Sequence, residues 1–187
     1  GSVELDGHGK PARFYGLMRV ITGWKKREDE LERMAYFDDL TGHLNRASLQ
    51  EALDEVLTNC RELNKSAAYL LVNIDRLGML NDAYGFDIAD TVITDIGKRV
   101  EDYTGFEDII GRAGGNQFGL VLTDATDEKL RKVAEQILSS TRRREVSTDA
   151  GPLAVTLSLG GVILPNNAAD SREAMGRAEE ALSKAKQ

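Results

Sequence analysis

The stretch Gly111–Leu122 reads Gly-Arg-Ala-Gly-Gly-Asn-Gln-Phe-Gly-Leu-Val-Leu, and it decides the fold of the chain. The short run Asp108–Ile110 leads into it, and the apolar run Phe118–Leu122 leads out. Two adjacent glycines and two amides lie between these runs, which is typical of a β-hairpin with a tight tip. Glycine permits positive φ and has no Cβ to obstruct a ligand. The tip is therefore either a plain solvent-facing turn or a place where backbone approaches a bound molecule.

The composition indicates a globular chain with room for one sizeable core and a fragment of a neighbouring unit. It has 187 residues, of which 41% are hydrophobic and 29% charged. The net charge of -7 argues against a uniformly basic surface for nucleic acid, although a local basic pocket stays open. The single cysteine, Cys60, excludes an internal disulfide. No apolar run approaches the roughly 20 residues of a membrane helix. We expect a cytoplasmic domain, and a membrane anchor elsewhere in a longer parent protein stays open.

The first third of the chain predicts a hairpin followed by two helices. Residues 3–22 are rich in β-formers on either side of a glycine-rich turn. Residues 23–37 predict an amphipathic helix, which is either a connector from an upstream module or a helix packed on its own domain. A second helix, Arg46–Leu63, carries one apolar face, and Ala67–Ile74 is a near-continuous apolar run typical of a buried central strand.

The remaining elements alternate around the hairpin. The apolar spacing predicts helices over 77–84, 87–103 and 126–144, one strand over 153–163 with a bulge at its two glycines, and a last helix over 170–186. From Ala67 the order is β-α-α-β-β-α-β-α, which without the extra helix is the split βαβ arrangement. The sequence therefore predicts an α+β, ferredoxin-like fold of the nucleotidyl cyclase palm type. We expect a mainly antiparallel central sheet with helices on one face.

Two amides lie where this fold would place a phosphoryl-transfer site. Asn73 ends the first strand of the sheet and Asn116 tips the hairpin, so we expect the two to be neighbours. Phosphoryl transfer with two Mg²⁺ ions favours carboxylates at such points. A neutral amide supplies no charge to hold the metal, and losing about 4 kcal/mol of metal assistance slows a reaction roughly a thousandfold.

Six short motifs follow one another along the chain. Asp38–Arg46 is similar to the pattern D-x-L-T-G-L-x-N-R, and Asn73–Asp82 is similar to D-x-D-x-F-K-x-x-N-D. The others are carried by Tyr84–Asp90, Gly114–Phe118, Val155–Gly160 and Arg177–Lys186. In this order the motifs resemble the GGDEF family, the diguanylate cyclases of bacterial cyclic di-GMP signalling, over about Tyr36 to Lys186.

The same resemblance divides the chain into three parts. Residues 1–22 resemble the last strands of a PAS sensor, and 23–37 its exit helix acting as a connector. Residues 38–187 resemble a degenerate GGDEF domain. An isolated hairpin is marginal in water, and a PAS remnant explains why one precedes the domain.

The departures from the family pattern concern catalysis. The family's metal ligands fall on Asn73 and Asn116, with Ile74 as a backbone ligand, and both acidic side chains are absent. Gln117, Gly78 and Phe86 stand where the family has an acidic residue, a lysine and a histidine. Gly105 stands where the inhibitory R-x-x-D motif has its arginine. The resemblance thus implies no catalytic residue and no dependable metal site, with Mg²⁺ present only if GTP binds as in the family.

The residues that are retained concern nucleotide binding. Asn81 and Asp90 fall on positions that hydrogen-bond guanine in the family, which suits an Asp that accepts from guanine N–H groups. Gly114 and Gly115 leave room for phosphates at the hairpin tip beside Asn116, and Lys186 falls on a phosphate-contacting lysine. A helix cap for Asn81 and a solvated helix residue for Asp90 are the structural alternatives.

The sequence therefore favours a GGDEF domain that makes no cyclic di-GMP and regulates an adjoining domain, such as an EAL phosphodiesterase, while binding GTP. One alternative is a weak diguanylate cyclase that joins two GTP molecules in a homodimer. Another is a ligand-free dimerisation scaffold. PAS and EAL domains are the expected neighbours, and nucleic acid is not an expected partner.

Overall fold

A computed structural model describes residues 2–5, 11–15 and 33–186, which fall into two compact units, 1–34 and 35–187. In the first unit, β1 (Ser2–Leu5) pairs antiparallel with β2 (Pro11–Tyr15), so a hairpin forms within the predicted range 3–22, of which residues 6–10 and 16–22 lie outside the described residues. Its assignment to a PAS sensor stays a prediction. The connector helix predicted over 23–37 lies mostly outside the described residues, although 33–36 are helical.

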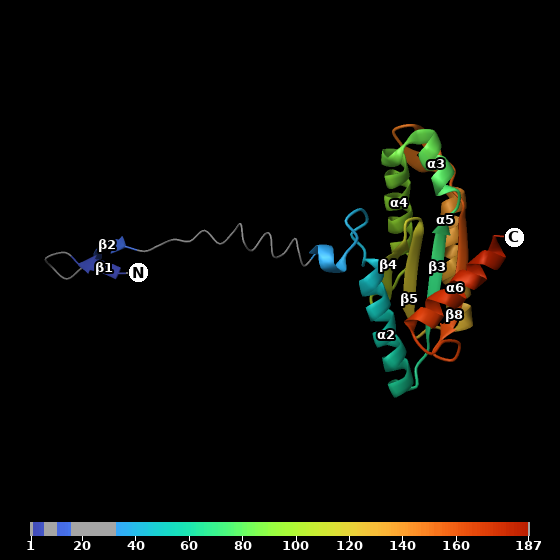
Figure 1. Cartoon of the computed structure of the whole chain (residues 1–187), viewed down its shortest axis with the longest axis horizontal. Coiled ribbons are helices and arrows are strands. Elements are labelled where there is room, and N and C mark those ends of the chain that lie inside the picture. Colours follow the sequence, from blue (N-terminus) through green and yellow to red (C-terminus); the bar gives the residue numbers. More distant parts are fainter. Residues whose placement is uncertain (1, 6–10, 16–32, 187) are drawn as a thin grey trace. The chain divides into compact units, whose positions relative to one another are not determined.

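The second unit is built on a four-stranded sheet with the order β4-β5-β3-β8 (Figure 1). These strands are β3 (Ala67–Ile74), β4 (Ile109–Gly114), β5 (Gln117–Thr123) and β8 (Leu157–Leu164). Every neighbouring pair is antiparallel. The predicted α+β fold with an antiparallel central sheet flanked by helices is confirmed.

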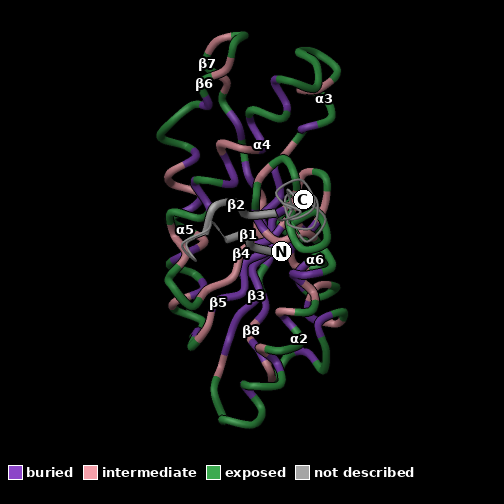
Figure 2. The backbone as a smooth tube through the Cα atoms, turned by 90° about the vertical axis from the view of Figure 1, so that its left-hand side faces the viewer, coloured by how far each residue is buried: buried purple, intermediate pink, exposed green. Residues whose placement is uncertain are grey.

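Helices cover both faces of this sheet, so the expectation of helices on one face was wrong. Helices α2 (Arg46–Leu63) and α6 (Ser171–Ala185) contribute to one hydrophobic core, and α4 (Phe86–Glu101) and α5 (Asp127–Arg143) to the other. All eight residues of β3 are buried, and alternate residues enter opposite cores. A strand that is apolar on both sides requires cover on both sides. Figure 2 shows the buried positions concentrated along the sheet.

The helix ends follow local capping chemistry. The side chains of Asn45, Thr126 and Asp170 accept hydrogen bonds from the third backbone N–H of α2, α5 and α6 respectively. The short helix α3 (Leu77–Tyr84) follows Arg76, whose φ of 55° is unusual for a residue other than glycine. The five helices predicted from Arg46 onward all form, with their ends shifted by at most two residues.

The strand predicted over 153–163 was wrong in two respects. Leu153 belongs to a separate small hairpin of β6 (Val146–Thr148) and β7 (Gly151–Leu153), and β8 begins only at Leu157. The pairing of β3 with β8 has no register shift, so no bulge forms there. Gly160 instead permits close helix packing, because a Cβ on it would lie 2.2 Å from the carbonyl oxygen of Ala178 in α6.

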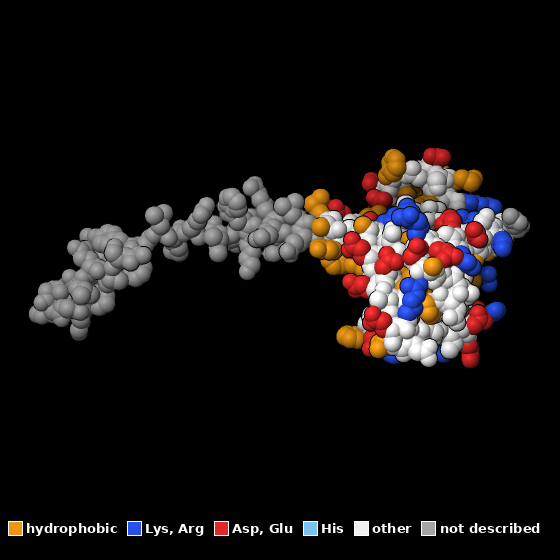
Figure 3. Space-filling model, turned by 60° about the horizontal axis from the view of Figure 1, so that its bottom comes forward, with side chains coloured by type: hydrophobic (Ala, Val, Ile, Leu, Met, Phe, Trp, Pro, Cys, Tyr) orange, Lys and Arg blue, Asp and Glu red, His pale blue; other side chains and the backbone are white. Residues whose placement is uncertain are grey.

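The charged side chains on the surface are of both signs, as the composition of the chain predicts. In Figure 3, acidic and basic side chains are interspersed on the face in view, without a continuous basic surface. Within the described ranges, none of the helices combines the length and the apolar character that crossing a bilayer requires.

Candidate functional site

The hairpin tip contacts the end of β3 through the two amides that the sequence singled out. Asn116 Nδ2 donates to Asn73 Oδ1 at 3.0 Å and to the Ile74 carbonyl oxygen at 3.0 Å. The backbone adds a third bond, from Ile74 N to the Asn116 carbonyl oxygen at 2.9 Å. The pairing of Asn73 with Gln117 across β3 and β5 brings these groups together. The expectation that Asn73 and Asn116 are neighbours is confirmed.

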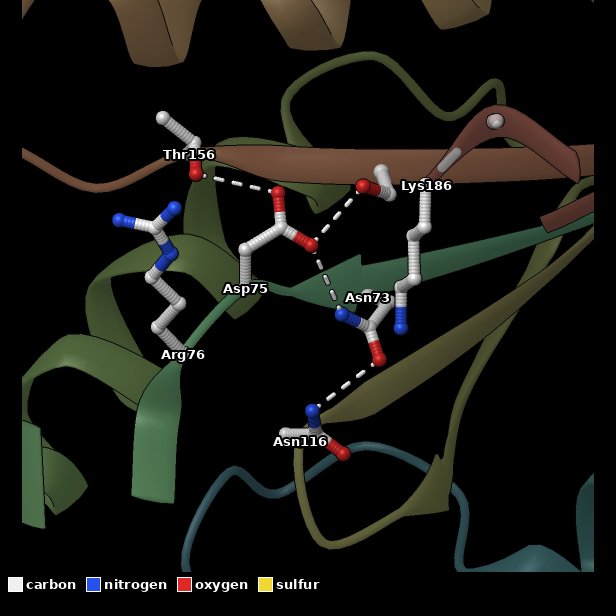
Figure 4. Close-up of a pocket in the computed structure, with 8 residues that line it drawn as sticks. Asn73, Asp75, Arg76, Asn116, Thr156 and Lys186 are labelled. Carbon is white, nitrogen blue, oxygen red and sulfur yellow. Dashed lines mark hydrogen bonds between the residues drawn. The ribbon is translucent and has the colours of Figure 1, made fainter. Parts of the chain in front are cut away.

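The amide network continues to a carboxylate. Asn73 Nδ2 donates to Asp75 Oδ1 at 3.1 Å. Asp75 also accepts from Ser158 Oγ at 2.9 Å and Thr156 Oγ1 at 3.0 Å (Figure 4). These hydrogen-bond partners fix the orientation of both side-chain amides, because each NH₂ group faces oxygen atoms and Asn73 Oδ1 faces a donor. Asn73, which is only 2% exposed, thus has each end of its side chain satisfied within the protein.

These residues line a pocket of about 510 Å³. The lining residues are Asn73, Asp75, Arg76, Asn116, Thr156, Ser158, Ala185 and Lys186. In Figure 4, Lys186 extends toward the amide pair, and Arg76 lies on the other side of Asp75. Neither cation has an ion-pair partner among the residues that the structure describes. Two cations therefore face one carboxylate, which suits an anionic ligand.

The residues present do not fit a Mg²⁺ ion of the kind that the family resemblance implies. Mg²⁺ requires several oxygen ligands and charge to offset its dehydration. Asn73 Oδ1 and the Ile74 carbonyl oxygen already accept from Asn116, and both oxygens of Asp75 accept hydrogen bonds. Among the described residues, no group of three or more His, Cys, Asp or Glu side chains could hold a metal.

The side chain of Arg112 hydrogen-bonds to the backbone of the glycine turn. Its Nε donates to the Gly114 carbonyl oxygen at 2.9 Å, and its Nη2 donates to that of Gly115. The guanidinium pairs with Asp38 at 3.3 Å and lies 5.5 Å from the centre of the Phe118 ring. Burial lowers the pKa of Arg112, and the nearby Asp38 carboxylate opposes this shift. The turn is therefore fixed through its carbonyl groups, and a Cβ on Gly115 would meet no atom within 4 Å.

The segment before α2 fastens this hairpin to the rest of the domain. Asp38 accepts from Thr41 N at 3.0 Å and Thr41 Oγ1 at 2.8 Å. The Leu44 carbonyl oxygen accepts from Arg112 N at 2.7 Å, which makes an isolated bridge beside β4. Asn45 Nδ2 donates to the Ala35 carbonyl oxygen at 2.7 Å. The sequence indicated only a family motif over Asp38–Arg46 and not this contact, because a partner 74 residues away leaves no local pattern.

The guanine-contacting positions of the family do not line the pocket beside Lys186. Asp90 is exposed on α4 and lines a separate cavity of about 490 Å³ that also includes Leu40 and Lys98. Asn81, in α3, has a buried Oδ1 that accepts no hydrogen bond from the described part of the chain. Of the predicted site residues, the pocket brings together Asn73, Asn116 and Lys186, and it leaves Asn81, Asp90, Gly114 and Gly115 outside its lining.

Five pocket residues were not predicted as site residues: Asp75, Arg76, Thr156, Ser158 and Ala185. Asp75 belongs to the D-x-D motif and Ser158 to the V-T-x-S strand, so the family motifs carried a signal for both. Arg76 has no such signal, because its place at the pocket depends on the left-handed turn before α3.

The residual aspartate of the R-x-x-D position has a structural role. Asp108 Oδ1 accepts from Thr123 N at 2.9 Å, and Oδ2 accepts from Gly105 N at 2.8 Å. Its side chain is only 4% exposed and lies 3.5 Å from Lys129 Nζ. The carboxylate is thus used within the fold to join the loop before β4 to the end of β5.

Comparisons with known proteins show which family shares the sequence features of this domain. A family model described as "Diguanylate cyclase, GGDEF domain" matches residues 35–187. Cyclic di-GMP phosphodiesterase NbdA of Pseudomonas aeruginosa is 29% identical over 156 residues, which cover 83% of this chain and 20% of NbdA. Diguanylate cyclase TpbB of the same organism is 28% identical over 173 residues, which cover 90% of this chain and 39% of TpbB. The chain thus spans between a fifth and two fifths of these relatives.

Solved structures agree in fold. The GGDEF domain of TpbB matches with a TM-score of 0.77 and 26% identity, covering 81% of this chain and 88% of that structure. A sensory box/GGDEF family protein of Caulobacter crescentus matches with a TM-score of 0.75 and 26% identity, covering 81% of this chain and 97% of that structure. These similarities confirm the cyclase-like topology in which the amide pair lies.

Proposed function

The chain belongs to the GGDEF family, the diguanylate cyclase domains of cyclic di-GMP signalling, and from this premise we propose that it makes no cyclic di-GMP and instead serves as a GTP-binding regulatory domain. One observation carries the proposal. The hydrogen bond from Asn116 to Asn73 lies where the family resemblance puts two metal-binding carboxylates.

Loss of the metal accounts for loss of the reaction. Joining a 3′-hydroxyl to an α-phosphate requires activation of the hydroxyl and neutralisation of developing charge, and metal ions supply several kcal/mol for both. A loss of about 4 kcal/mol corresponds to roughly a thousandfold lower rate. No other group in the pocket replaces that contribution, because the Asp75 carboxylate is already engaged by three hydrogen-bond donors.

Nucleotide binding is supported by what remains around the hairpin. Lys186 and Arg76 provide positive charge for phosphates, and the turn at Gly115 is open to a ligand. The buried Oδ1 of Asn81 lacks a donor among the described residues, and the N–H groups of a guanine would supply one. Asp90 on α4 would accept from the same edge of the base.

The regulated partner would be an adjoining domain of a longer protein. Relatives of this chain carry the names of phosphodiesterases as well as of diguanylate cyclases. We therefore propose an EAL phosphodiesterase as the regulated domain, an upstream PAS sensor as the input, and a cytoplasmic location for the assembly.

The test is product formation together with calorimetry on the whole chain. Incubation with GTP and Mg²⁺, followed by chromatography, is expected to give no cyclic di-GMP. Calorimetry is expected to show GTP binding that Asp90→Ala abolishes. Cyclic di-GMP production would establish the weak cyclase instead. The absence of heat with GTP, with and without Mg²⁺, would favour the ligand-free dimerisation scaffold.

A further inference from the structure

We propose that the pocket at Asn73 and Asn116 binds a nucleoside polyphosphate that carries no metal ion, and that it excludes the complex of that nucleotide with a divalent metal. The inference rests on the proposed function for the identity of the ligand. Its metal part rests on the amide pair alone.

The NH₂ group of Asn116 lies between the two oxygens that a metal at this point would contact. An amide NH₂ group has two hydrogens, and Asn116 donates both, one to Asn73 Oδ1 and one to the Ile74 carbonyl oxygen. Those two oxygens are the groups at the end of β3 that would otherwise face a cation. The NH₂ group of Asn116 therefore occupies the place of the cation and performs the same bridging between strand and hairpin.

The charges of the pocket favour the same ligand. Arg76 and Lys186 outweigh the single carboxylate of Asp75, so the lining carries a net positive charge. Two further carboxylates at positions 73 and 116 would make it negative and would require a cation. As it stands, the lining attracts a polyphosphate most strongly when no Mg²⁺ has neutralised part of the ligand's charge.

The pocket still has hydrogen-bond donors for such an anion. Asn73 Nδ2 donates one hydrogen to Asp75 and has a second available, and the ammonium of Lys186 extends toward the same amide (Figure 4). Arg76 supplies a planar set of N–H donors on the other side of Asp75. An anion held by these groups needs no bridging metal.

The exchange of amides for acids should be reversible by substitution. Asp has nearly the shape of Asn, so Asn73→Asp/Asn116→Asp keeps the volume of the site and changes donors into acceptors. Two carboxylates and the Ile74 carbonyl oxygen would then converge on one point, which is the oxygen set that Mg²⁺ and Mn²⁺ prefer. We expect the double variant to gain a divalent-cation site that the wild-type chain lacks.

Calorimetry of the whole chain tests the ligand. GTP is titrated into wild type and into the double variant, in EDTA and in excess Mg²⁺. Wild type is expected to bind GTP about tenfold more tightly in EDTA, and the double variant is expected to require Mg²⁺. Lys186→Met and Arg76→Met should each weaken binding in EDTA. Tighter binding of the Mg²⁺ complex by wild type would overturn the inference.

Manganese binding without nucleotide separates this inference from the proposed function. Electron paramagnetic resonance of Mn²⁺ is expected to show free metal with wild type and bound metal with the double variant, whose fold is checked by circular dichroism. Mn²⁺ bound to wild type at this pocket would overturn the metal part even if GTP binds. Failure of GTP to bind in either buffer would overturn the proposed function and the ligand class, and the Mn²⁺ result would still decide whether the amide pair excludes metal.

Discussion

The two sides of the β4–β5 hairpin have different chemistry. Its outer side is fastened to the domain by Arg112, which pairs with Asp38 and lies over the Phe118 ring, and by the bridge from Leu44 to β4. Its tip is joined to β3 by uncharged groups, the side chain of Asn73 and the backbone of Ile74, which both hydrogen-bond to Asn116. The outer side is thus held by a charged pair, Arg112 with Asp38, whereas the side chains that meet at the tip are neutral amides.

Under the proposed function, this difference means that the scaffold of a nucleotide site can persist without its metal chemistry. The hairpin keeps its position because an amide can bridge the same two strands that a bound cation would otherwise join. Amides are nearly the same size as carboxylates, so the exchange costs no packing. Neutral amides at Asn73 and Asn116 supply no charge to hold a metal.

The strongest test of this comparison removes the cation on each side of the hairpin. Arg112→Met removes an ion pair and leaves the Gly114 and Gly115 carbonyl oxygens without their donors, so we expect a loss of about 3 kcal/mol in the free energy of unfolding. Arg76→Met removes a cation with no ion-pair partner among the described residues, and we expect a change within about 0.5 kcal/mol. Urea unfolding followed by circular dichroism measures both. Equal effects would show that the hairpin is not fastened mainly from its outer side.

A second test adds one methyl group on each side. In Gly111→Ala, the new Cβ would lie 2.8 Å from Leu49 Cβ and 3.0 Å from the Leu44 carbonyl oxygen, so we expect a destabilisation of about 2 kcal/mol. In Gly115→Ala, the Cβ meets no atom within 4 Å, and stability should change by less than about 0.5 kcal/mol. Thermal unfolding gives both values. If Gly115→Ala were as destabilising as Gly111→Ala, the tip would be packed as tightly as the outer side of the hairpin.

Much of this fold could be read from local sequence patterns, because each pattern has a local physical cause. The continuous apolar run of β3 predicted a central strand, and helical spacing located α2 through α6. The two covered faces of the sheet could have been inferred from the same run, since β3 has no polar side to expose to water. The break at Leu153 was missed because 154–156 continue the apolar pattern without continuing the strand.

The candidate site was only partly readable for a different reason. Proximity of Asn73 and Asn116 follows from the order of the strands, and the structure confirms it. The bond between the two amides depends on side-chain orientation, which no spacing encodes. The role of Arg112 depends on Asp38, which is distant in sequence, and the role of Arg76 depends on one left-handed backbone conformation.

The smallest expected effect is on the pH dependence of stability. It compares the uncharged tip with an ion pair on the protein surface. The backbone N–H of Ala169, followed by Arg177, holds the pKa of Glu173 below its usual value. A carboxyl group with a lowered folded-state pKa stabilises the protein above its unfolded-state pKa, and this contribution disappears as the pH falls toward the folded-state value. Glu173→Gln should therefore make stability less dependent on pH below about 4.5.

The amide tip adds nothing to this acid sensitivity through positions 73 and 116, because amides do not titrate. Two acids there would face each other, and repulsion between the two carboxylates raises the pKa at which the second proton leaves. Asn73→Asp/Asn116→Asp should therefore behave in the opposite sense when measured in EDTA, with stability lost as the pH rises toward that raised value. Urea unfolding at a series of pH values from about 4 to 7 compares the three chains. If the double variant were as stable at neutral pH as at acid pH, the two acids would not converge, and the tip would lack the geometry of a metal site.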